Sequence, residues 1–336
     1  MKKYLLSNSG KFYKVNLHNH TNISDGSLTP EQTKAAYIEK GYSAVAFTDH
    51  DVLIPHNDLT DENFVALNGY EMEINGLLTG KERPLHRLIT AHICFVALKP
   101  NTTRQPCFHR TKYHVGNGIN YVGQVDYDTT LPDYEREYGA DCVNDIIKKG
   151  RDGGFFVTYN HPTWSGETYN EYMKYDGMHA MEIYNNECIL IGADEYNHRV
   201  YDDMLRGGKN LYCIATDDMH KLASVGGGYT MIKADKLDYE SLTSSLVSGN
   251  FYASTGAEIK ELYVEDGFLC VTTAPSKCIG LSTEKMQVKS FYDADGNVTQ
   301  AKFKIEPEYG YMRITVTDKQ NNKAYTNAYY VKDLIK

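Results

Sequence analysis

Up to about residue 250, short apolar runs alternate with polar turns and with stretches whose apolar residues recur at helical spacing. The apolar runs predict strands at residues 13–17, 43–47, 92–98, 154–158, 180–184 and 211–215. The stretches of helical spacing predict helices at residues 30–40, 140–149, 195–206 and 239–248. This alternation implies an α/β fold built on a parallel sheet, either open or closed into a barrel.

The first helix carries the clearest end signals. Thr29 and Gln32 have the spacing of a capping box, and Pro30 between them occupies the first helical position. Gly41 is the expected glycine just beyond the end of the helix. We therefore expect the helix to begin at Pro30 and to end before Gly41.

Two regions depart from the alternation. Residues 100–138 are polar, rich in Tyr, Asn and Asp, and have no sustained period, which is typical of a functional lid or a disordered insertion. After residue 256 the helical spacing disappears, and strands are predicted at residues 261–264, 267–272, 288–292, 302–305, 313–317 and 324–331. Asp295-Gly296 predicts a hairpin among them. We expect one domain at residues 1–257 and a small antiparallel β-sandwich at residues 258–336.

Composition narrows the class of protein. The formal net charge of −9 repels a phosphate backbone, so binding to a nucleic-acid polymer is disfavoured. No apolar run approaches the roughly 18 residues of a membrane span, and the residues before Ser7 are too few for a signal sequence. The seven cysteines show no CxxC spacing, and their odd number argues against a disulfide framework. We expect a cytoplasmic protein with reduced thiols and no membrane partner.

Histidines and carboxylates follow the ends of several predicted strands. His18 and His20 come directly after the first strand, where residues two apart point to the same side and can share one ion. The same spacing recurs at Asp218 and His220, after the strand at 211–215. Further candidates stand at or near other strands, namely Asp25, His50, Glu71, His92 and His161. Because buried imidazoles and carboxylates are costly without ions, this pattern predicts a metal site at the carboxyl ends of the strands.

These residues stand in motifs that resemble those of the PHP (polymerase and histidinol phosphatase) family over about residues 14–255. The motifs are His18-x-His20, Ser24-Asp25-Gly26, Thr48-Asp49-His50-Asp51, Gly69-x-Glu71, His92, Asn160-His161-Pro162 and Asp218-x-His220. The resemblance implies a distorted (β/α)7 TIM-like barrel with a trinuclear metal site at its C-terminal face. The segment at residues 324–327 is similar to a β-domain attached to some bacterial members.

The resemblance also implies a distribution of the ligands. One ion would be held by His18, His20, Glu71 and Asp218. Glu71 would bridge to a second ion held by His92 and His161. The third ion would be held by Asp25, His50 and His220. Two alternatives stay open: Glu73 for Glu71, and His86 for His92. The preceding Gly69-Tyr70 favours Glu71, and the apolar run at residues 93–96 favours His92.

By this resemblance the protein is expected to be a metal-dependent phosphoesterase, a hydrolase that cleaves a small phosphorylated metabolite or nucleotide with a metal-activated hydroxide. Ligands without thiolate suit Zn, Mn or Fe, in up to three divalent ions. Three such ions, three carboxylates and one bridging hydroxide leave a net charge of about +2, which attracts a phosphate dianion. The alternatives are another metal-assisted hydrolase, acting on a C–N or lactone bond, and a non-catalytic carbohydrate-binding or scaffold protein.

Weaker candidates lie outside the motifs. His198 is a candidate proton donor and Arg199 a candidate phosphate clamp, although a solvated helix face is favoured for both. Arg110 and Lys112 belong to a basic cluster at residues 104–114 that is a candidate for substrate binding, although a solvated loop is favoured. The glycines at residues 226–228 suit either a phosphate contact or, preferentially, a tight turn. Trp164 is a candidate wall of the pocket or, equally, a plain packing residue. Asp217 is expected to support the site or to pack.

Overall fold

A computed structural model describes residues 2–80, 83–285 and 289–335, with side chains outside 78–87. The strands form one hydrogen-bonded network, so the protein is a mixed α/β fold with a large sheet. The strands of the first 234 residues are β1 (Lys3–Tyr4), β2 (Lys11–Asn16), β3 (Ala44–Phe47), β4 (Val65–Gly80), β5 (Arg83–Ala97), β6 (Phe155–Asn160), β7 (Ala180–Asn185), β8 (Tyr212–Thr216) and β9 (Tyr229–Ala234). Apart from β1, they lie side by side in the order β9-β2-β3-β4-β5-β6-β7-β8.

The helices among the described residues are α1 (Pro30–Glu39), α2 (Ala140–Asp152), α3 (Tyr169–Tyr172), α4 (Asn186–Leu190), α5 (His198–Arg206), α6 (Tyr239–Val247) and α7 (Val331–Leu334). Of these, α1, α2, α5 and α6 occur where the sequence predicts helices, whereas the short helices α3, α4 and α7 were not predicted. At the start of α1 the Thr29 hydroxyl accepts from the Gln32 N–H, and the Gln32 side chain accepts from the Thr29 N–H. Gly41 adopts a φ of 76°, as a glycine at a helix end commonly does. None of the helices in the described ranges is long and apolar enough to cross a membrane.

The expectation of a parallel sheet fails at β5 and at β9. The pairs β2–β3, β3–β4, β6–β7 and β7–β8 are parallel, but β5 is antiparallel to both β4 and β6, and β9 is antiparallel to β2. Only two residues separate β4 from β5, whereas a parallel connection needs a dozen or more. No ladder joins β8 to β9 within the described ranges, so a closed seven-stranded barrel is not shown.

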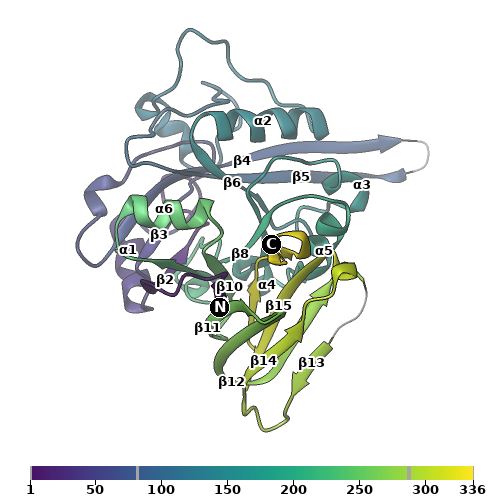
Figure 1. The fold of residues 1–336 in the computed structure, drawn as a ribbon. Coiled ribbons are helices and arrows are strands. Elements are labelled where there is room, and N and C mark those ends of the chain that lie inside the picture. Colours follow the sequence, from purple (N-terminus) through teal and green to yellow (C-terminus); the bar gives the residue numbers. More distant parts are fainter. Residues whose placement is uncertain (1, 81–82, 286–288, 336) are drawn as a thin grey trace.

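The β4–β5 hairpin is longer than the strand predicted at residues 92–98, and it extends beyond the rest of the sheet in Figure 1. Its inner half is buried, and only that half carries the apolar run that the sequence signals. In its outer half Leu77 faces Leu88 across the ladder, and these side chains are 53% and 81% exposed. At this pair of residues the hairpin is therefore held by backbone pairing rather than by burial of the two leucine side chains.

The C-terminal strands are antiparallel, as predicted, and they are hydrogen-bonded to the main sheet through the first of them. They are β10 (Phe251–Ser254), β11 (Ile259–Glu265), β12 (Phe268–Thr283), β13 (Lys289–Tyr292), β14 (Val298–Lys304), β15 (Tyr311–Asp318), β16 (Lys323–Thr326) and β17 (Tyr329–Tyr330). The long strand β12 pairs with β11 and β14 through its first half and with β13 and β15 through its second half. A separate β-sandwich is not confirmed. The single strand β12 links the β11–β14 side of these strands to the β13–β15 side. Strand β10 pairs with β16 on one edge and with β9 of the main sheet on the other. Residue 288 of the strand predicted at 288–292 lies outside the described residues.

Side-chain contacts also cross the predicted domain boundary. Arg313 of β15 donates to both carboxylate oxygens of Asp202 on α5, at 2.8 and 2.7 Å, and both side chains are almost fully buried. Tyr311 donates to the same carboxylate. Asn327 accepts from the Cys213 N–H at the start of β8. The division near residue 257 therefore stays a prediction, and the two parts share a continuous interior.

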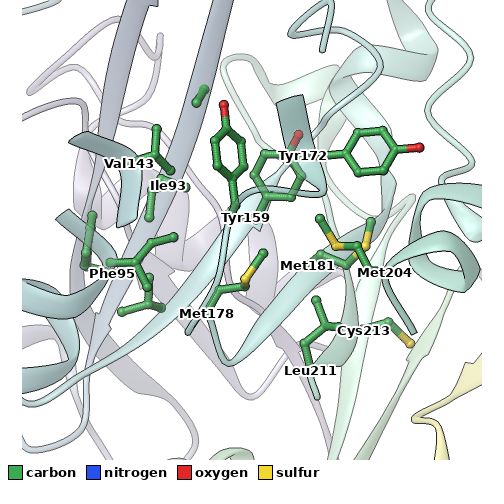
Figure 2. Close-up of a cluster of buried hydrophobic side chains, with 14 of the residues drawn as sticks. Ile93, Phe95, Val143, Tyr159, Tyr172, Met178, Met181, Met204, Leu211 and Cys213 are labelled. Carbon is green, nitrogen blue, oxygen red and sulfur yellow. The ribbon is translucent and has the colours of Figure 1, made fainter. Parts of the chain in front are cut away.

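A core of aromatic and sulfur-containing side chains lies beneath the strands that lead to the candidate ligands. Figure 2 shows Ile93 and Phe95 of β5, Tyr159 of β6 and Val143 of α2 gathered with side chains from the neighbouring elements. All four are fully buried. This packing fixes β5 and β6 relative to α2. The seven cysteines, all within the described ranges, have free thiols.

Candidate metal centre

The nine side chains expected to bind metal come together in one place. Their ligand atoms form four overlapping groups, and the atoms of each group lie within 4.8 Å of one another. The groups are His20 with Asp25, His50 and His220; His18 with Glu71 and His161; His18 with His20 and Asp218; and His50 with Glu71 and His92. Residues more than 200 positions apart in the chain therefore converge on a single cluster.

Strand ends and sheet register position these side chains. His18 and His20 follow β2, and Asp218 and His220 follow β8; an isolated bridge between Asn19 and Met219 holds the two segments together. A second bridge joins His50, which follows β3, to Glu71 on β4. His92 lies opposite Glu73 in the β4–β5 ladder, so it shares a face with Glu71, two residues away.

Glu71 lies at the centre of the cluster. Its carboxylate oxygens are 3.2 Å from Nε2 of His18, 3.2 Å from Nδ1 of His92 and 3.3 Å from Nδ1 of His50. Asp218 occupies a similar position on the other side, 3.0 Å from Nε2 of His20 and 3.2 Å from Nε2 of His18. Both carboxylates and all these imidazoles are buried.

The cluster opens into a cavity of about 360 Å³. Seven of the nine side chains line it, and the remaining lining residues are Glu73, Val115, Trp164, Glu187, Cys188 and Ile191. The Trp164 ring stands edge-on at the mouth, with its centroid 5.0 Å from that of His161 and 5.5 Å from that of His92. Trp164 is thus a wall of the pocket, one of the two roles considered from the sequence.

The donor atoms fit divalent transition metals. Four buried atoms of the cluster make no hydrogen bond in the described part of the chain: Nδ1 of His20, His50 and His92, and Oδ1 of Asp218. Three of them have a carboxylate oxygen or an imidazole nitrogen within 3.3 Å, but at angles that do not suit a hydrogen bond. Buried polar atoms are nearly always satisfied, so such a concentration of unsatisfied donor atoms indicates a missing partner. Imidazole nitrogens and carboxylate oxygens without thiolate match Zn, Mn or Fe.

Without an ion, the carboxylates favour protonated imidazoles. Burial opposes the charged form of His20, but Asp218 and Glu71 raise its pKa to about 10. Burial also opposes the charge on His161, and its neighbours Glu71 and Asp218 raise its pKa to about 9. Burial lowers the pKa of His50 to about 3, helped by the nearby charge of His20. Metal ions therefore compete with protons for some of these nitrogens and not for others.

The backbone is strained at three positions of the site. Asp51, His161 and Asp218 have φ angles of 60°, 22° and 50°, in the left-handed region that residues other than glycine rarely adopt. Such conformations cost energy and persist where the surroundings enforce them, and they are common in functional sites. Two of the three residues are candidate ligands and the third adjoins His50, so the strain coincides with the cluster.

A family model for the PHP domain matches residues 16–182, a range that contains seven of the nine candidate ligands and ends at Glu182. The chain carries a PHP domain. A search of curated proteins finds no match.

Solved structures similar to the PHP domain protein have low sequence identity. A two-domain protein with a predicted PHP-like metal-dependent phosphoesterase, from Bacteroides vulgatus, is 15% identical; the match covers 97% of this chain and 98% of that one, with a TM-score of 0.43. An amidohydrolase from Chromobacterium violaceum with bound sulfate and no metal is 15% identical, with 62% and 87% covered and a TM-score of 0.41. A candidate metal-dependent phosphoesterase from Bifidobacterium adolescentis is 14% identical, with 64% and 89% covered and a TM-score of 0.39.

Glu182 supports the PHP site and was missed by the sequence analysis. It is fully buried on β7, and its Oε1 lies 2.7 Å from Nδ1 of His18. Its other oxygen accepts from the backbone N–H of His161 at 2.9 Å and from the Asn185 side chain at 3.0 Å. Because the carboxylate accepts at Nδ1, Nε2 of His18 is left facing the cluster. The available signal was a charged residue within an otherwise apolar predicted strand at residues 180–184.

Two further carboxylates hold loops of the site. Asp49 accepts from the backbone and hydroxyl groups of Thr21 and Ser24, and so orders the loop that leads to Asp25. Asp217 accepts backbone N–H groups from all three glycines at residues 226–228, each at 2.8 Å. The glycine N–H groups are therefore occupied by the protein's own carboxylate, which agrees with the tight-turn interpretation.

The polar segment at residues 100–138 is ordered against the ligand loops. Arg136 pairs with Asp51 at 2.5 Å, and the Gln105 side chain bonds the backbone of Asp51 and Leu53. Asn117 bonds the backbone oxygens at residues 22 and 24, and Val115 lines the cavity. These contacts show that the segment is no disordered insertion; its role as a lid stays a prediction.

The cations considered for substrate binding lie in other surroundings. Arg110 pairs with Asp133 at 2.7 Å, Lys112 with Glu135 at 2.7 Å and Arg199 with Asp203 at 2.9 Å. His198 is exposed at the start of α5, where desolvation by neighbouring groups and the nearby charge of Arg313 lower its pKa. None of these four residues is among the described residues that line the cavity. The side chain of His86, the alternative to His92, lies outside the described residues.

Proposed function

We propose that the protein is a metal-dependent phosphoesterase that hydrolyses a small phosphorylated metabolite or nucleotide at the cavity above the nine-residue cluster. The observation that carries this proposal is the concentration of buried imidazole and carboxylate atoms, four of them without a hydrogen-bond partner, at the base of a cavity of about 360 Å³. This cavity volume suits a small molecule rather than a nucleic-acid polymer. The free cysteines fit a reducing compartment such as the cytoplasm.

The four overlapping groups support a site for up to three divalent ions, Zn, Mn or Fe. The group of His20, Asp25, His50 and His220 is the most complete set, and Glu71 and Asp218 are placed to bridge the others. When bound, such ions lower the pKa of water and stabilise negative charge on phosphoryl oxygens. His18, His20 and His50 each belong to two groups, so the groups alone do not assign these imidazoles to single ions, and the distribution implied by the resemblance stays a prediction.

The side chains around the cluster hold the site in shape. Glu182 orients His18 and fixes the backbone at His161, while Asp49 orders the loop that carries Asp25. Trp164 and Val115 limit access of water from the mouth. Strained positions and buried partners together preorganise the ligand atoms, which reduces the reorganisation that substrate binding requires.

Metal analysis and a phosphoester panel test the proposal together. The purified protein, reconstituted with Zn, Mn or Fe, should retain more than one ion per chain and hydrolyse phosphate monoesters such as p-nitrophenyl phosphate. Asp218→Asn removes a ligand charge while keeping the size of the side chain, and it should lower hydrolysis by orders of magnitude. Asp295→Asn, in an exposed turn, is the matched control and should leave activity unchanged.

Two results would contradict the proposal. Retention of at most one ion after reconstitution with each metal would argue against the multinuclear site. A fully loaded protein that cleaves an amide or lactone panel but no phosphoester would instead establish the alternative hydrolase chemistry.

A further inference from the structure

The cavity walls outside the candidate ligands carry acidic and apolar side chains. Among the described residues that line the cavity there is no lysine or arginine. The lining residues that are not candidate ligands include two glutamates, Glu73 and Glu187, and three apolar side chains, Val115, Trp164 and Ile191. A second anionic group on a substrate would therefore meet carboxylates and no protein cation within this cavity.

The two glutamates differ in their surroundings. Glu187 pairs with Lys221 at 3.3 Å and accepts from the Ser224 hydroxyl, so its charge is already compensated. Glu73 follows Glu71 by two residues on β4, and the strand geometry turns both side chains to the face of the site. One Glu73 oxygen accepts from Asn75 at 2.9 Å, and the other lies 4.0 Å from Nε2 of His92. Glu73 is absent from the four candidate metal groups.

A carboxylate accepts hydrogen bonds and cannot donate them, so Glu73 selects groups that donate. An ammonium group would also donate, but it would lose much of its hydration against the apolar side chains of Val115, Trp164 and Ile191. Neutral hydroxyl groups can donate to Glu73 and bring no charge into the cavity. The half-exposed Trp164 and Ile191 complement them with an apolar surface for the C–H faces of a hydroxylated carbon skeleton.

We propose that the substrate is the phosphate monoester of a neutral polyhydroxylated compound, a sugar or polyol, whose hydroxyl groups bond to Glu73 while its skeleton packs on Trp164. This inference rests on the proposed function and narrows its substrate class. It excludes substrates with a second phosphate or a carboxylate, and it makes Glu73 a residue that determines specificity rather than a metal ligand.

A matched set of esters tests the charge preference in the metal-loaded protein. Glucose 6-phosphate and glucosamine 6-phosphate are ring esters with a neutral or a cationic group, and 6-phosphogluconate is an open-chain ester with an anionic group; sorbitol 6-phosphate is the neutral open-chain reference for 6-phosphogluconate. The kcat/KM for glucose 6-phosphate should exceed that for glucosamine 6-phosphate, and the kcat/KM for sorbitol 6-phosphate that for 6-phosphogluconate, by about tenfold or more. The reason is that Glu73 repels the carboxylate of 6-phosphogluconate and the apolar wall strips hydration from the ammonium of glucosamine 6-phosphate. A preference for 6-phosphogluconate or for glucosamine 6-phosphate would overturn the inference.

Glu73→Gln tests the assigned residue. It should raise KM for glucose 6-phosphate about two- to tenfold, the usual value of one hydrogen bond. It should also reduce the ratio of the kcat/KM for glucose 6-phosphate to that for 6-phosphogluconate. Activity toward p-nitrophenyl phosphate, which has no sugar hydroxyl groups, should fall by a smaller factor than activity toward glucose 6-phosphate. Glu62→Gln, on an exposed loop, is the control. Loss of bound metal in Glu73→Gln, or equal losses on both esters, would overturn the inference.

Binding without turnover gives an independent readout, because Trp164 is the single tryptophan of the chain. The phosphonate analogue of glucose 6-phosphate, with a methylene group in place of the ester oxygen, should change Trp164 fluorescence in the metal-loaded protein and bind more tightly than the analogue of 6-phosphogluconate. Trp164→Phe gives the fluorescence that remains without tryptophan, which comes from the tyrosines. If the metal-loaded protein hydrolyses no phosphate ester, p-nitrophenyl phosphate included, the proposed function itself fails. If it hydrolyses p-nitrophenyl phosphate but prefers sugar phosphates with a second charged group, only the inference about the substrate class fails.

Discussion

Glu182→Gln is the substitution that tests most sharply how the protein positions its metal ligands. The wild-type carboxylate accepts four hydrogen bonds: from His18 Nδ1 and the Thr216 hydroxyl at one oxygen, and from His161 N–H and the Asn185 amide at the other. A glutamine keeps the shape but offers only one accepting oxygen. Two buried donors then face an NH2 group, whichever way the amide is turned.

The size of the effect follows from these contacts. Each buried donor left without an acceptor costs about 1–3 kcal/mol, and substitutions of groups that orient metal ligands typically weaken metal binding about 10- to 100-fold. We therefore expect both a lower unfolding free energy in the metal-free protein and a lower metal affinity. The loss of metal affinity should be larger than the loss of unfolding free energy alone would produce. The reason is that His18 loses the partner that holds its Nε2 toward the cluster.

Zinc affinity is measured by competition with a chromophoric chelator, and stability by urea unfolding of the metal-free protein. Glu240→Gln, at an exposed position on α6, is the control for removal of one negative charge. A Glu182→Gln protein that folds and binds zinc with wild-type affinity would refute the positioning role. If Glu182→Gln does not fold, Glu182→Asp keeps the charge while shortening the side chain, and it should show the same direction of effect on metal affinity.

Three further predictions concern pH, the loop cations and the contact between the two parts of the chain. Because neighbouring carboxylates raise the pKa values of His20 and His161 to about 10 and about 9 in the metal-free protein, both imidazoles hold protons at pH 7. Zinc binding should therefore release protons, and zinc affinity should rise as pH increases toward 9. Calorimetry in buffers of different ionisation enthalpy measures this release, and its absence would contradict the prediction. Arg110→Ala with Lys112→Ala should leave KM within twofold for sugar phosphates, since both cations are paired within their own exposed segment; a several-fold rise in steady-state KM would restore them as substrate contacts. Arg313→Met should destabilise the protein by about 3–5 kcal/mol in urea unfolding by leaving Asp202 buried and unpaired, and an unchanged midpoint would show that the pair is not needed.

Local signals in the sequence were sufficient for the helix ends and for the placing of the candidate ligands. Thr29 and Pro30 specify the start of α1 through contacts within one turn, so no tertiary information is needed. His18, His20, Asp218 and His220 follow short apolar strands, and the carboxyl ends of neighbouring parallel strands meet at one edge. These features depend on spacing along the chain, which a sequence displays directly.

Features that depend on long-range contacts were not predicted. Glu182 and Arg136 act through partners far away in the sequence, and neither stands in a motif with a recognisable spacing. The antiparallel direction of β5 depends on the two-residue connection to β4, which the polar outer half of the hairpin concealed. The expected sandwich was not confirmed, because a period of two residues identifies strands but does not say which strands pair.

Anomalous diffraction from crystals of the protein reconstituted with zinc tests the central claim most directly. The account predicts strong peaks at the zinc edge within the nine-residue cluster, each about 2.0–2.2 Å from imidazole nitrogens and carboxylate oxygens. At least one peak should lie among His20, Asp25, His50 and His220, and another should contact Glu71. Zinc bound only at surface residues, with this buried cluster free of metal at saturating concentration, would contradict the account.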